Sequence, residues 1–270
     1  MSIFQAIIFG AVQGLTEFLP ISSTAHLILL PWFLGWPDPG LAFDVALHLG
    51  TLVALLVYFR AEWYALITAA LGILRGETKS QDARMAMLIV VATIPGAVAG
   101  ALFEHKVEDA FRSPALIAVM LIVMALVLLV AEFVGSRKKS INEISWGDAI
   151  TVGLAQAAAI VPGVSRSGST ITAGLFLSMK RSAAAQFSFY LSAPIIAGAV
   201  AKKMIDIAKS GAGGDQMMAV VVGIVSSAVV GYMAIAFLMR YLQTHNTYLF
   251  VIYRIALGIV VLLAFWFRFR

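Results

Sequence analysis

The sequence contains no cysteine, which excludes disulfides, thiolate catalysis and metal sites built on cysteine. Charge is also scarce, because only 12% of the 270 residues are Asp, Glu, Lys or Arg and 61% are apolar, whereas soluble domains carry roughly 25% charged residues. A phosphate-binding P-loop, an HExxH motif and a GxSxG motif are all missing, which excludes the sites that those motifs mark. Water is therefore not the main solvent of this chain.

What the sequence does contain is long apolar runs. At least six of them reach the roughly 17 to 25 residues that a helix needs to cross a bilayer. We therefore predict an all-α polytopic membrane protein with about six transmembrane helices. No Lys or Arg precedes Arg60, so the apolar start lacks the basic region of a cleaved signal peptide, and we expect it to remain in the mature protein. The six runs cover about 41–60, 85–103, 114–134, 182–201, 216–239 and 248–267.

Two further apolar segments are interrupted. Residues 1–34 contain QGLTEFLPISSTAH, and residues 149–179 contain QAAAIVPGVSRSGST. Pro20 and the Pro162-Gly163 pair disfavour continuous helix, and the Ser and Thr residues that follow are of the type that caps a new helix. Such breaks occur at membrane depth only where protein or a water-filled cavity covers the freed backbone groups. We predict two re-entrant broken-helix hairpins.

The two interrupted segments resemble each other. Gln13 precedes Pro20 much as Gln156 precedes Pro162, and LAFDVALHLGTLVA resembles AAQFSFYLSAPIIA at an offset of about 144. The single membrane domain 1–270 is thus predicted to be an internal repeat, with one unit near 1–135 and the other near 145–270. If each unit crosses the membrane three times, the second is inverted relative to the first, and the two breaks meet near the midplane.

Basic residues suggest the orientation. Loops 60–84, 135–147, 180–181 and 240–247 hold ten Lys and Arg, and the other loops hold seven. Because cytoplasmic loops are enriched in Lys and Arg, we expect both termini to lie on the outer, periplasmic side of the membrane. The net charge of +5 is explained by basic loop residues that contact anionic lipid of the bilayer, and no nucleic-acid partner is expected.

Three ionisable residues lie inside the interrupted segments, namely Glu17, His26 and Arg166. A charge within a membrane is costly and is usually functional or paired. Arg166 stands among Ser, Gly and Thr residues, which suits a phosphate group because a guanidinium binds two phosphate oxygens and helix N-termini offer free N–H groups. The structural alternative is an arginine that reaches the interface or holds loop carbonyls.

Ser23 and His26 share one face of the helix that should begin near Ser22 or Ser23, so the imidazole could accept the Ser23 proton. Without that geometry, His26 could protonate a leaving group or attack phosphorus. Glu17 could orient His26, act as a base or hold a divalent cation, or it could form a structural ion pair with Arg254. Asp44 and His48 could face the same cavity, but the sequence assigns them no chemistry.

QGLTEFLPISSTAH and PGVSRSGST together resemble the two signature motifs of the bacitracin-resistance type of undecaprenyl-diphosphate phosphatase, and the similarity covers essentially the whole chain. The resemblance implies hydrolysis of a polyprenyl diphosphate lipid to undecaprenyl phosphate and inorganic phosphate, recycling of the carrier for peptidoglycan synthesis, bacitracin tolerance, and dependence on a divalent cation such as Mg or Ca. Gln13 stands where many members have a second glutamate, and Ala25 where glycine is common. The positions carried over are Gln13 and Glu17 for a metal, Glu17, Ser23, His26 and Arg166 for catalysis, and Ser22, Thr24, Ser165, Ser167 and Thr170 for the substrate phosphate.

The sequence leaves several alternatives open. Either Ser23 attacks the terminal phosphorus or His26 and Glu17 activate water. A lipid-phosphate transporter or flippase would use the same inverted repeats, but it would need no nucleophile and base; an inorganic-anion channel is a third possibility. The oligomeric state is also open, with a homodimer as one option.

Overall fold

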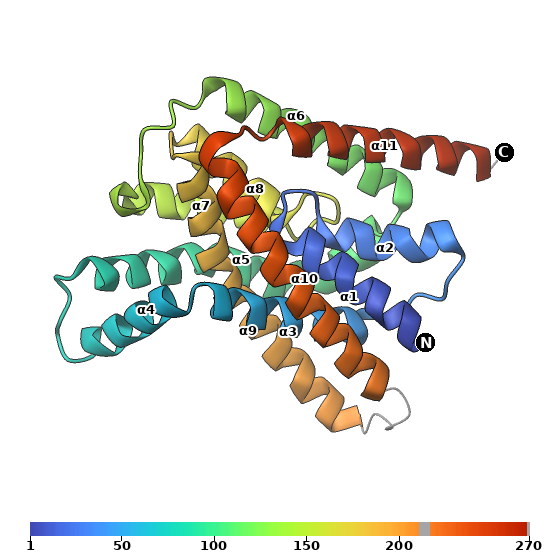
Figure 1. Cartoon of the computed structure of the whole chain (residues 1–270), viewed down its shortest axis with the longest axis horizontal. Coiled ribbons are helices and arrows are strands. Elements are labelled where there is room, and N and C mark those ends of the chain that lie inside the picture. Colours follow the sequence, from blue (N-terminus) through green and yellow to red (C-terminus); the bar gives the residue numbers. More distant parts are fainter. Residues whose placement is uncertain (211–216, 269–270) are drawn as a thin grey trace.

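The computed structural model describes residues 1–210 and 217–268, which form eleven α-helices, one short 3-10 helix at Ile141–Glu143 and no β-sheet (Figure 1). The predicted all-α class is confirmed. The helices are α1 (Ile3–Phe18), α2 (Ser23–Leu34), α3 (Leu41–Tyr58), α4 (Arg60–Ile73), α5 (Gln81–Phe111), α6 (Pro114–Val134), α7 (Trp146–Ala158), α8 (Arg166–Phe176), α9 (Arg181–Ser210), α10 (Met217–Thr244) and α11 (Tyr248–Arg268).

Five helical segments in the described part of the chain are long and apolar enough to cross a membrane: Gln81–Phe103, Pro114–Val134, Arg181–Lys202, Met217–Thr244 and Tyr248–Arg268. A sixth span is obtained when α3 and α4 count as one, although they are bent by 88°. The loop expected at 60–84 was therefore partly wrong, since α4 fills most of it. Arg60 and Glu62 interrupt the hydropathy there, but the Ala- and Leu-rich sequence favours helix.

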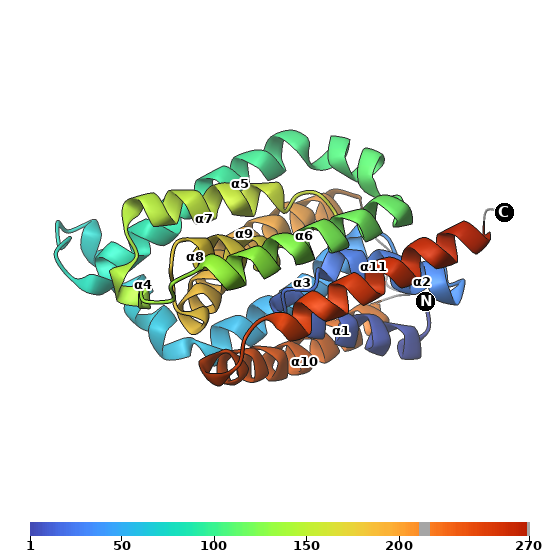
Figure 2. The same cartoon turned by 90° about the horizontal axis from the view of Figure 1, so that it is seen from above.

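Both predicted breaks are present. The first separates α1 from α2 at residues 19–22, and the second separates α7 from α8 at residues 159–165. Each pair forms a hairpin, and the hairpins enter from opposite ends of the molecule, so that their breaks meet in the middle (Figures 1 and 2). The residue that caps the N-terminus of each second helix has the same unusual backbone, with φ of 75° at Ser22 and 74° at Ser165.

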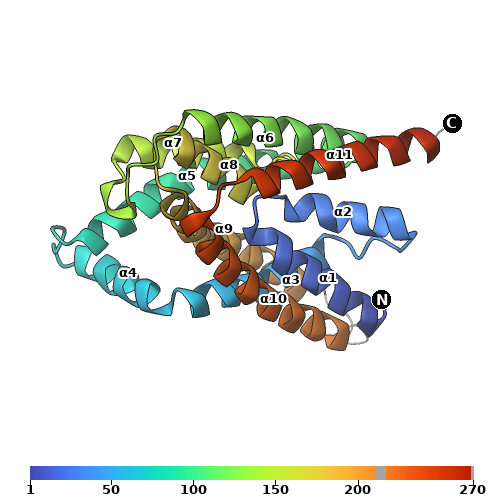
Figure 3. The same ribbon diagram turned by 45° about the horizontal axis from the view of Figure 1, so that its top comes forward.

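Each broken helix packs against a helix far away in the sequence. α1 lies on α10 and α7 lies on α5. Glycines make these approaches close, because a Cβ at Gly10 would stand 2.3 Å from the Gly223 carbonyl oxygen and one at Gly153 would stand 2.5 Å from that of Ala92. Small residues commonly let membrane helices approach in this way. α11 lies along α6 (Figure 3).

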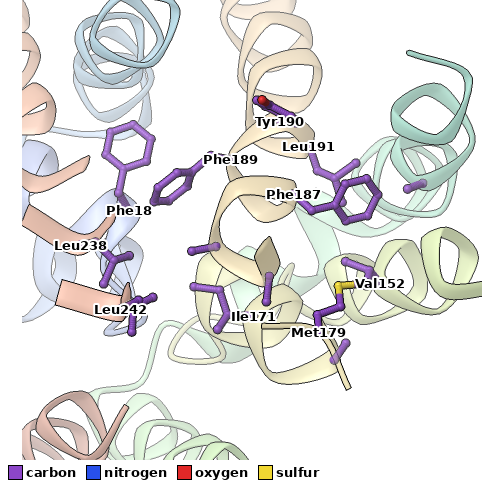
Figure 4. Packing of buried hydrophobic residues seen from close by; sticks show 14 of the residues in the cluster. Phe18, Val152, Ile171, Met179, Phe187, Phe189, Tyr190, Leu191, Leu238 and Leu242 are labelled. Carbon is purple, nitrogen blue, oxygen red and sulfur yellow. The ribbon is translucent and has the colours of Figure 1, made fainter. Parts of the chain in front are cut away.

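A hydrophobic core holds the inner ends of the hairpins in place. Phe18, the last residue of α1, is fully buried and meets the ring of Phe189 from α9 edge-on, with ring centroids 5.3 Å apart. Ile171 of α8 lies in the same cluster (Figure 4). The residues on either side of the breaks are thus fixed by packing.

The buried carboxylate of Glu132 stabilises the C-terminal end of α6. The Glu132 side chain is 1% exposed, and it pairs with Arg137 at 2.8 Å and with Arg181 at the start of α9. It also accepts a hydrogen bond of 2.8 Å from the Thr247 hydroxyl just before α11. This cluster joins three loops at one end of the bundle.

Candidate active site

A small polar cavity of about 90 Å³ lies where the two breaks meet. Six of the predicted site residues line it, so the structure brings residues from both breaks together. The lining residues are Glu17, Ser22, Ser23, Thr24, His48, Ala159, Val161, Ser165 and Arg166.

Glu17 is the centre of the polar contacts. Its Oε1 accepts a hydrogen bond from the Arg166 guanidinium at 2.5 Å, and its Oε2 accepts one from the Ser23 hydroxyl at 2.6 Å. The Gln13 amide donates to the same Oε2 at 3.0 Å, and His48 Nε2 stands 3.5 Å from it. The side chain is only 4% exposed. A carboxylate from the first break therefore links a hydroxyl and a cation across the cavity.

Arg166 uses only part of its guanidinium in this arrangement. Nη2 binds Glu17, whereas the buried Nη1 has no hydrogen-bond partner among the described residues. The side chain is 13% exposed and lines the cavity. A buried donor without a partner is costly, so Nη1 is well placed for an anion that enters the cavity.

Two helix N-termini supply further donors. The hydroxyls of Ser22 and Ser165 accept hydrogen bonds from the N–H groups of Ala25 and Gly168, respectively. Other N–H groups in the first turns of α2 and α8 have no partner within their own helix. Since both helices begin at the cavity, their positive dipole ends also favour an anion there.

Arg254 fixes both breaks from behind. It is fully buried in α11, and its guanidinium donates to the carbonyl oxygens of Pro20 at 3.1 Å, Gly163 at 2.8 Å and Val164 at 3.1 Å. The alternative ion pair between Glu17 and Arg254 is therefore wrong, because Glu17 pairs with Arg166. Arg254 instead satisfies carbonyls that the breaks leave without helical partners.

The expected hydrogen bond between Ser23 and His26 is not formed. Both ring nitrogens of His26 have other partners: Nδ1 lies 2.7 Å from the Ser22 carbonyl oxygen and Nε2 lies 2.6 Å from the Tyr253 hydroxyl. The Ser23 hydroxyl donates to Glu17 instead. The spacing correctly placed both residues in the first turn of α2, but the directions of their side chains depend on α1 and α11.

Two predicted phosphate ligands are turned away from the cavity. The Ser167 hydroxyl donates to the Leu19 carbonyl at 2.9 Å and so joins the two breaks. The Thr170 hydroxyl donates to the Arg166 carbonyl at 2.7 Å and contacts Ser188 of α9. Both are almost fully buried. In this structure they support the site and do not line it.

His48 and Tyr253 are two residues near the site to which the sequence alone assigns no role. His48 lines the cavity, and its Nδ1 lies 2.7 Å from the Asp44 carbonyl oxygen, which fixes the proton on that nitrogen. An ionisable residue inside the apolar run 41–60 was the available signal. Tyr253 carries no comparable signal, because tyrosines are common at membrane interfaces.

The residues around Glu17 could hold a divalent cation only if the substrate supplies some of the cation's ligands. Within residues 1–210 and 217–268, no three His, Asp or Glu side chains gather as a metal cage would require. One carboxylate, Glu17, is present, and the buried Gln13 Oε1 has no hydrogen-bond partner in the described part of the chain. Mg²⁺ is commonly held by one or two carboxylates together with substrate phosphates and water, and Glu17 suits such a shared ion. Gln13 does not line the cavity and turns its Nε2 toward Glu17, so its amide would have to flip to bring Oε1 to the same ion.

Fold and cavity together define a class of protein: a polytopic helical membrane protein that encloses a polar cavity where the breaks of two interrupted helices meet. The chain belongs to the family of the bacitracin resistance protein BacA, whose family model matches residues 6–260. It is 48% identical over 268 residues to the undecaprenyl-diphosphatase of Moorella thermoacetica, with 99% of this chain and 100% of that protein covered. It is 50% identical over 262 residues to the undecaprenyl-diphosphatase of Pelotomaculum thermopropionicum, covering 97% of this chain and 96% of the relative.

Proposed function

We propose that this protein hydrolyses undecaprenyl diphosphate to undecaprenyl phosphate and inorganic phosphate. The observation that carries the proposal is the line of contacts from the Ser23 hydroxyl through Glu17 to Arg166, at 2.6 Å and 2.5 Å. These contacts support the assignment of Ser23 as the nucleophile, Glu17 as the proton acceptor and Arg166 as the cation that stabilises charge. The name shared by the relatives also favours a phosphatase over a lipid-phosphate transporter.

The substrate's terminal phosphate would enter the cavity while its polyprenyl tail stays in lipid. The phosphate would bind Arg166 Nη1 and the free N–H groups at the starts of α2 and α8. It would also compete with Glu17 for Arg166 Nη2. Binding of substrate would thereby release a Glu17 oxygen from the guanidinium, and that carboxylate would be free to accept a proton.

Ser23 would then attack the terminal phosphorus as Glu17 accepts the hydroxyl proton. The Ser23 Oγ–P bond forms while the bridging P–O bond breaks, and undecaprenyl phosphate leaves with the bridging oxygen and its electron pair. Arg166 stabilises the charge on the non-bridging oxygens. Water next displaces Ser23 from phosphorus, giving inorganic phosphate, and Ser23 recovers its proton through Glu17.

We further propose that Glu17, and Gln13 once its amide is flipped, would hold a divalent cation, Mg or Ca, together with the diphosphate of the substrate. Such a cation would neutralise charge on the diphosphate oxygens. The role of His26 in this scheme is to support the N-terminus of α2, since its Nδ1 binds the carbonyl oxygen of the capping residue Ser22.

The direct test is phosphate release from undecaprenyl diphosphate by the purified protein in detergent. It would compare wild type, Ser23→Ala, Glu17→Gln and the control Glu62→Gln, which lies on the exposed face of α4. We expect both site variants to lose at least 100-fold in kcat, the control to match wild type, and EDTA to stop turnover until Mg²⁺ or Ca²⁺ is added. A wild type that binds the lipid but releases no phosphate with any cation would refute the proposal. An active Ser23→Ala variant would instead favour direct attack by water.

We also propose that the protein lies in the bacterial inner membrane with its cavity open to the periplasm, and that units 1–135 and 145–270 form an inverted repeat. In the cell it would recycle the lipid carrier for peptidoglycan synthesis and confer bacitracin tolerance. The absence of cysteine makes the orientation testable with single cysteines. The two positions for cysteine are Asp38, in the loop between α2 and α3, and Glu77, in the loop between α4 and α5; both are exposed. The variants are Asp38→Cys and Glu77→Cys. A membrane-impermeant thiol reagent applied to intact spheroplasts should label the first and spare the second, and the reverse pattern would contradict the orientation.

A further inference from the structure

A tyrosine from the last helix is hydrogen bonded to His26 of the first hairpin. The Tyr253 hydroxyl lies 2.6 Å from His26 Nε2, and the two rings are nearly parallel, with an angle of 11° and 5.7 Å between centroids. Tyr253 is in α11 and His26 is in α2, so the contact joins segments 227 positions apart. Tyr253 does not line the cavity, so an influence on catalysis would have to pass through another residue.

The partners of His26 determine where its protons lie. A carbonyl oxygen only accepts hydrogen bonds, so the Nδ1 that faces the Ser22 carbonyl at 2.7 Å must carry a proton. In the neutral ring, Nε2 is then an acceptor, and the Tyr253 hydroxyl is the donor. If the ring gains a second proton, Nε2–H donates to the Tyr253 oxygen instead. Tyr253 therefore satisfies Nε2 in both protonation states.

The hydrogen bond between His26 Nδ1 and the Ser22 carbonyl connects His26 to the cavity. Ser22 is the capping residue of α2 with φ of 75°. It lines the cavity and directly precedes Ser23. A non-glycine residue at positive φ is held there only by its surroundings. The Nδ1–H bond to the Ser22 carbonyl is one of those restraints, and it persists only while the ring keeps its orientation. Tyr253 is the group that fixes the other edge of the ring.

We propose that Tyr253 is a positioning residue for phosphate ester hydrolysis that acts through His26, a role that rests on the proposed function of the cavity. Tyr253 holds the His26 ring, the ring holds the Ser22 carbonyl, and Ser22 sets the position of Ser23 against Glu17. Loss of the tyrosine hydroxyl should lower kcat and leave KM nearly unchanged, because Tyr253 does not contact the cavity. One neutral hydrogen bond corresponds to a drop of about 2- to 10-fold in kcat.

The test is a double-mutant cycle on kcat with undecaprenyl diphosphate, using Tyr253→Phe, His26→Ala and the double variant. Tyr248→Phe is the matched control, because Tyr248 begins the same helix and its ring contacts Phe133 instead of the site. We expect Tyr253→Phe to lose about 2- to 10-fold, the control to lose nothing, and the tyrosine substitution to have no further effect once His26 is alanine. A loss of the same size in the His26→Ala background, or full activity of Tyr253→Phe in an active wild-type preparation, would overturn the proposal. Inactive wild type would instead count against the phosphatase function.

A second measurement covers the case in which His26→Ala is too slow to assay. Protein labelled with ¹⁵N-histidine should show one ring resonance pair that disappears in His26→Ala. Its Nε2 shift should change in Tyr253→Phe and stay constant in Tyr248→Phe. An unchanged Nε2 shift in Tyr253→Phe would show that the hydroxyl does not hold the ring, and it would overturn the proposal without reference to activity.

Discussion

Replacing Arg166 with lysine would separate the two contacts that its guanidinium can make. Lysine retains a positive charge and could still pair with Glu17, but its ammonium group cannot provide the second, planar donor. The buried Nη1, which has no partner among the described residues, is the donor that lysine removes. A hydrogen bond to a charged group contributes about 1.5 to 3 kcal/mol, and tenfold in rate corresponds to about 1.4 kcal/mol. We therefore expect kcat of Arg166→Lys to fall about 10- to 150-fold.

Arg166→Ala should be affected more strongly than Arg166→Lys. It removes both donors and the charge, and an arginine that stabilises a transferring phosphoryl group is worth roughly 10³- to 10⁵-fold. The assay is initial-rate phosphate release at saturating lipid in detergent, with Arg240→Lys on the exposed face of α10 as the matched control. Size-exclusion profiles and thermal melts would confirm that each variant is folded.

The ordering of the two variants is the critical result. Arg166→Lys with wild-type kcat would show that Nη1 does not contact the reacting phosphate, and the assignment of the cavity would fail. Equal losses in the lysine and alanine variants would show that a point charge at this position contributes nothing to kcat. The loss could then not be separated into an ion pair with Glu17 and a second hydrogen bond from Nη1, and the reasoning would be wrong.

Three further variants test the supporting structure. Arg254→Met leaves the carbonyl oxygens of both breaks without their donor, at about 1 to 3 kcal/mol each, so the melting temperature in detergent should drop by more than about 6 °C; a change below 2 °C would contradict the role of Arg254. Gly153→Val forces a side chain against the Ala92 carbonyl of α5 and should cost about 1 to 3 kcal/mol of stability. The control Gly100→Val, where a Cβ would meet no atom within 4 Å, should have the melting temperature of wild type. Equal melting temperatures of the two variants would refute the close contact at Gly153. Glu132→Ala should lower stability by about 1 to 3 kcal/mol, because Arg137, Arg181 and the Thr247 hydroxyl lose their acceptor. It should leave kcat of the folded protein unchanged, because Glu132 lies three turns along α6 from Leu121, the α6 residue that Arg254 contacts; a selective loss of kcat would contradict that separation.

Local sequence signals predicted the elements that interrupt the membrane helices. Proline and the following serines placed both breaks, and the apolar runs placed the long helices. Glu17 and Arg166 were recognised because charges are rare in such segments. The directions of Ser23, His26 and Thr170 could not be predicted in the same way, because they depend on contacts with α1, α11 and α9. Periodicity within one helix shows which residues share a face, but it does not show which distant helix that face meets.

The sharp bend between α3 and α4 was missed for a related reason. Phe59, the residue at the bend, is neither glycine nor proline and therefore gives no breaker signal. Its ring is buried against Phe189 and Tyr190 of α9, and this long-range packing accompanies the change in direction. Asp44 and His48 showed the opposite difficulty: their spacing was visible in the sequence, but only the structure places His48 beside Glu17.

The packing of each broken helix on a distant partner has a consequence for biosynthesis. α1 is made first, but its partner α10 starts more than 200 positions later, and Arg254, which holds both breaks, comes later still. At about 5 to 20 residues per second, the first hairpin waits on the order of ten seconds or more before its glycine face can be covered. For most of that interval Arg166 has not yet been synthesised, so the Glu17 carboxylate lacks the guanidinium with which it pairs in the finished protein. The cavity is therefore among the last parts of the molecule to form, and a chain truncated before α11 would lack a finished site even though most of its membrane helices were already in place.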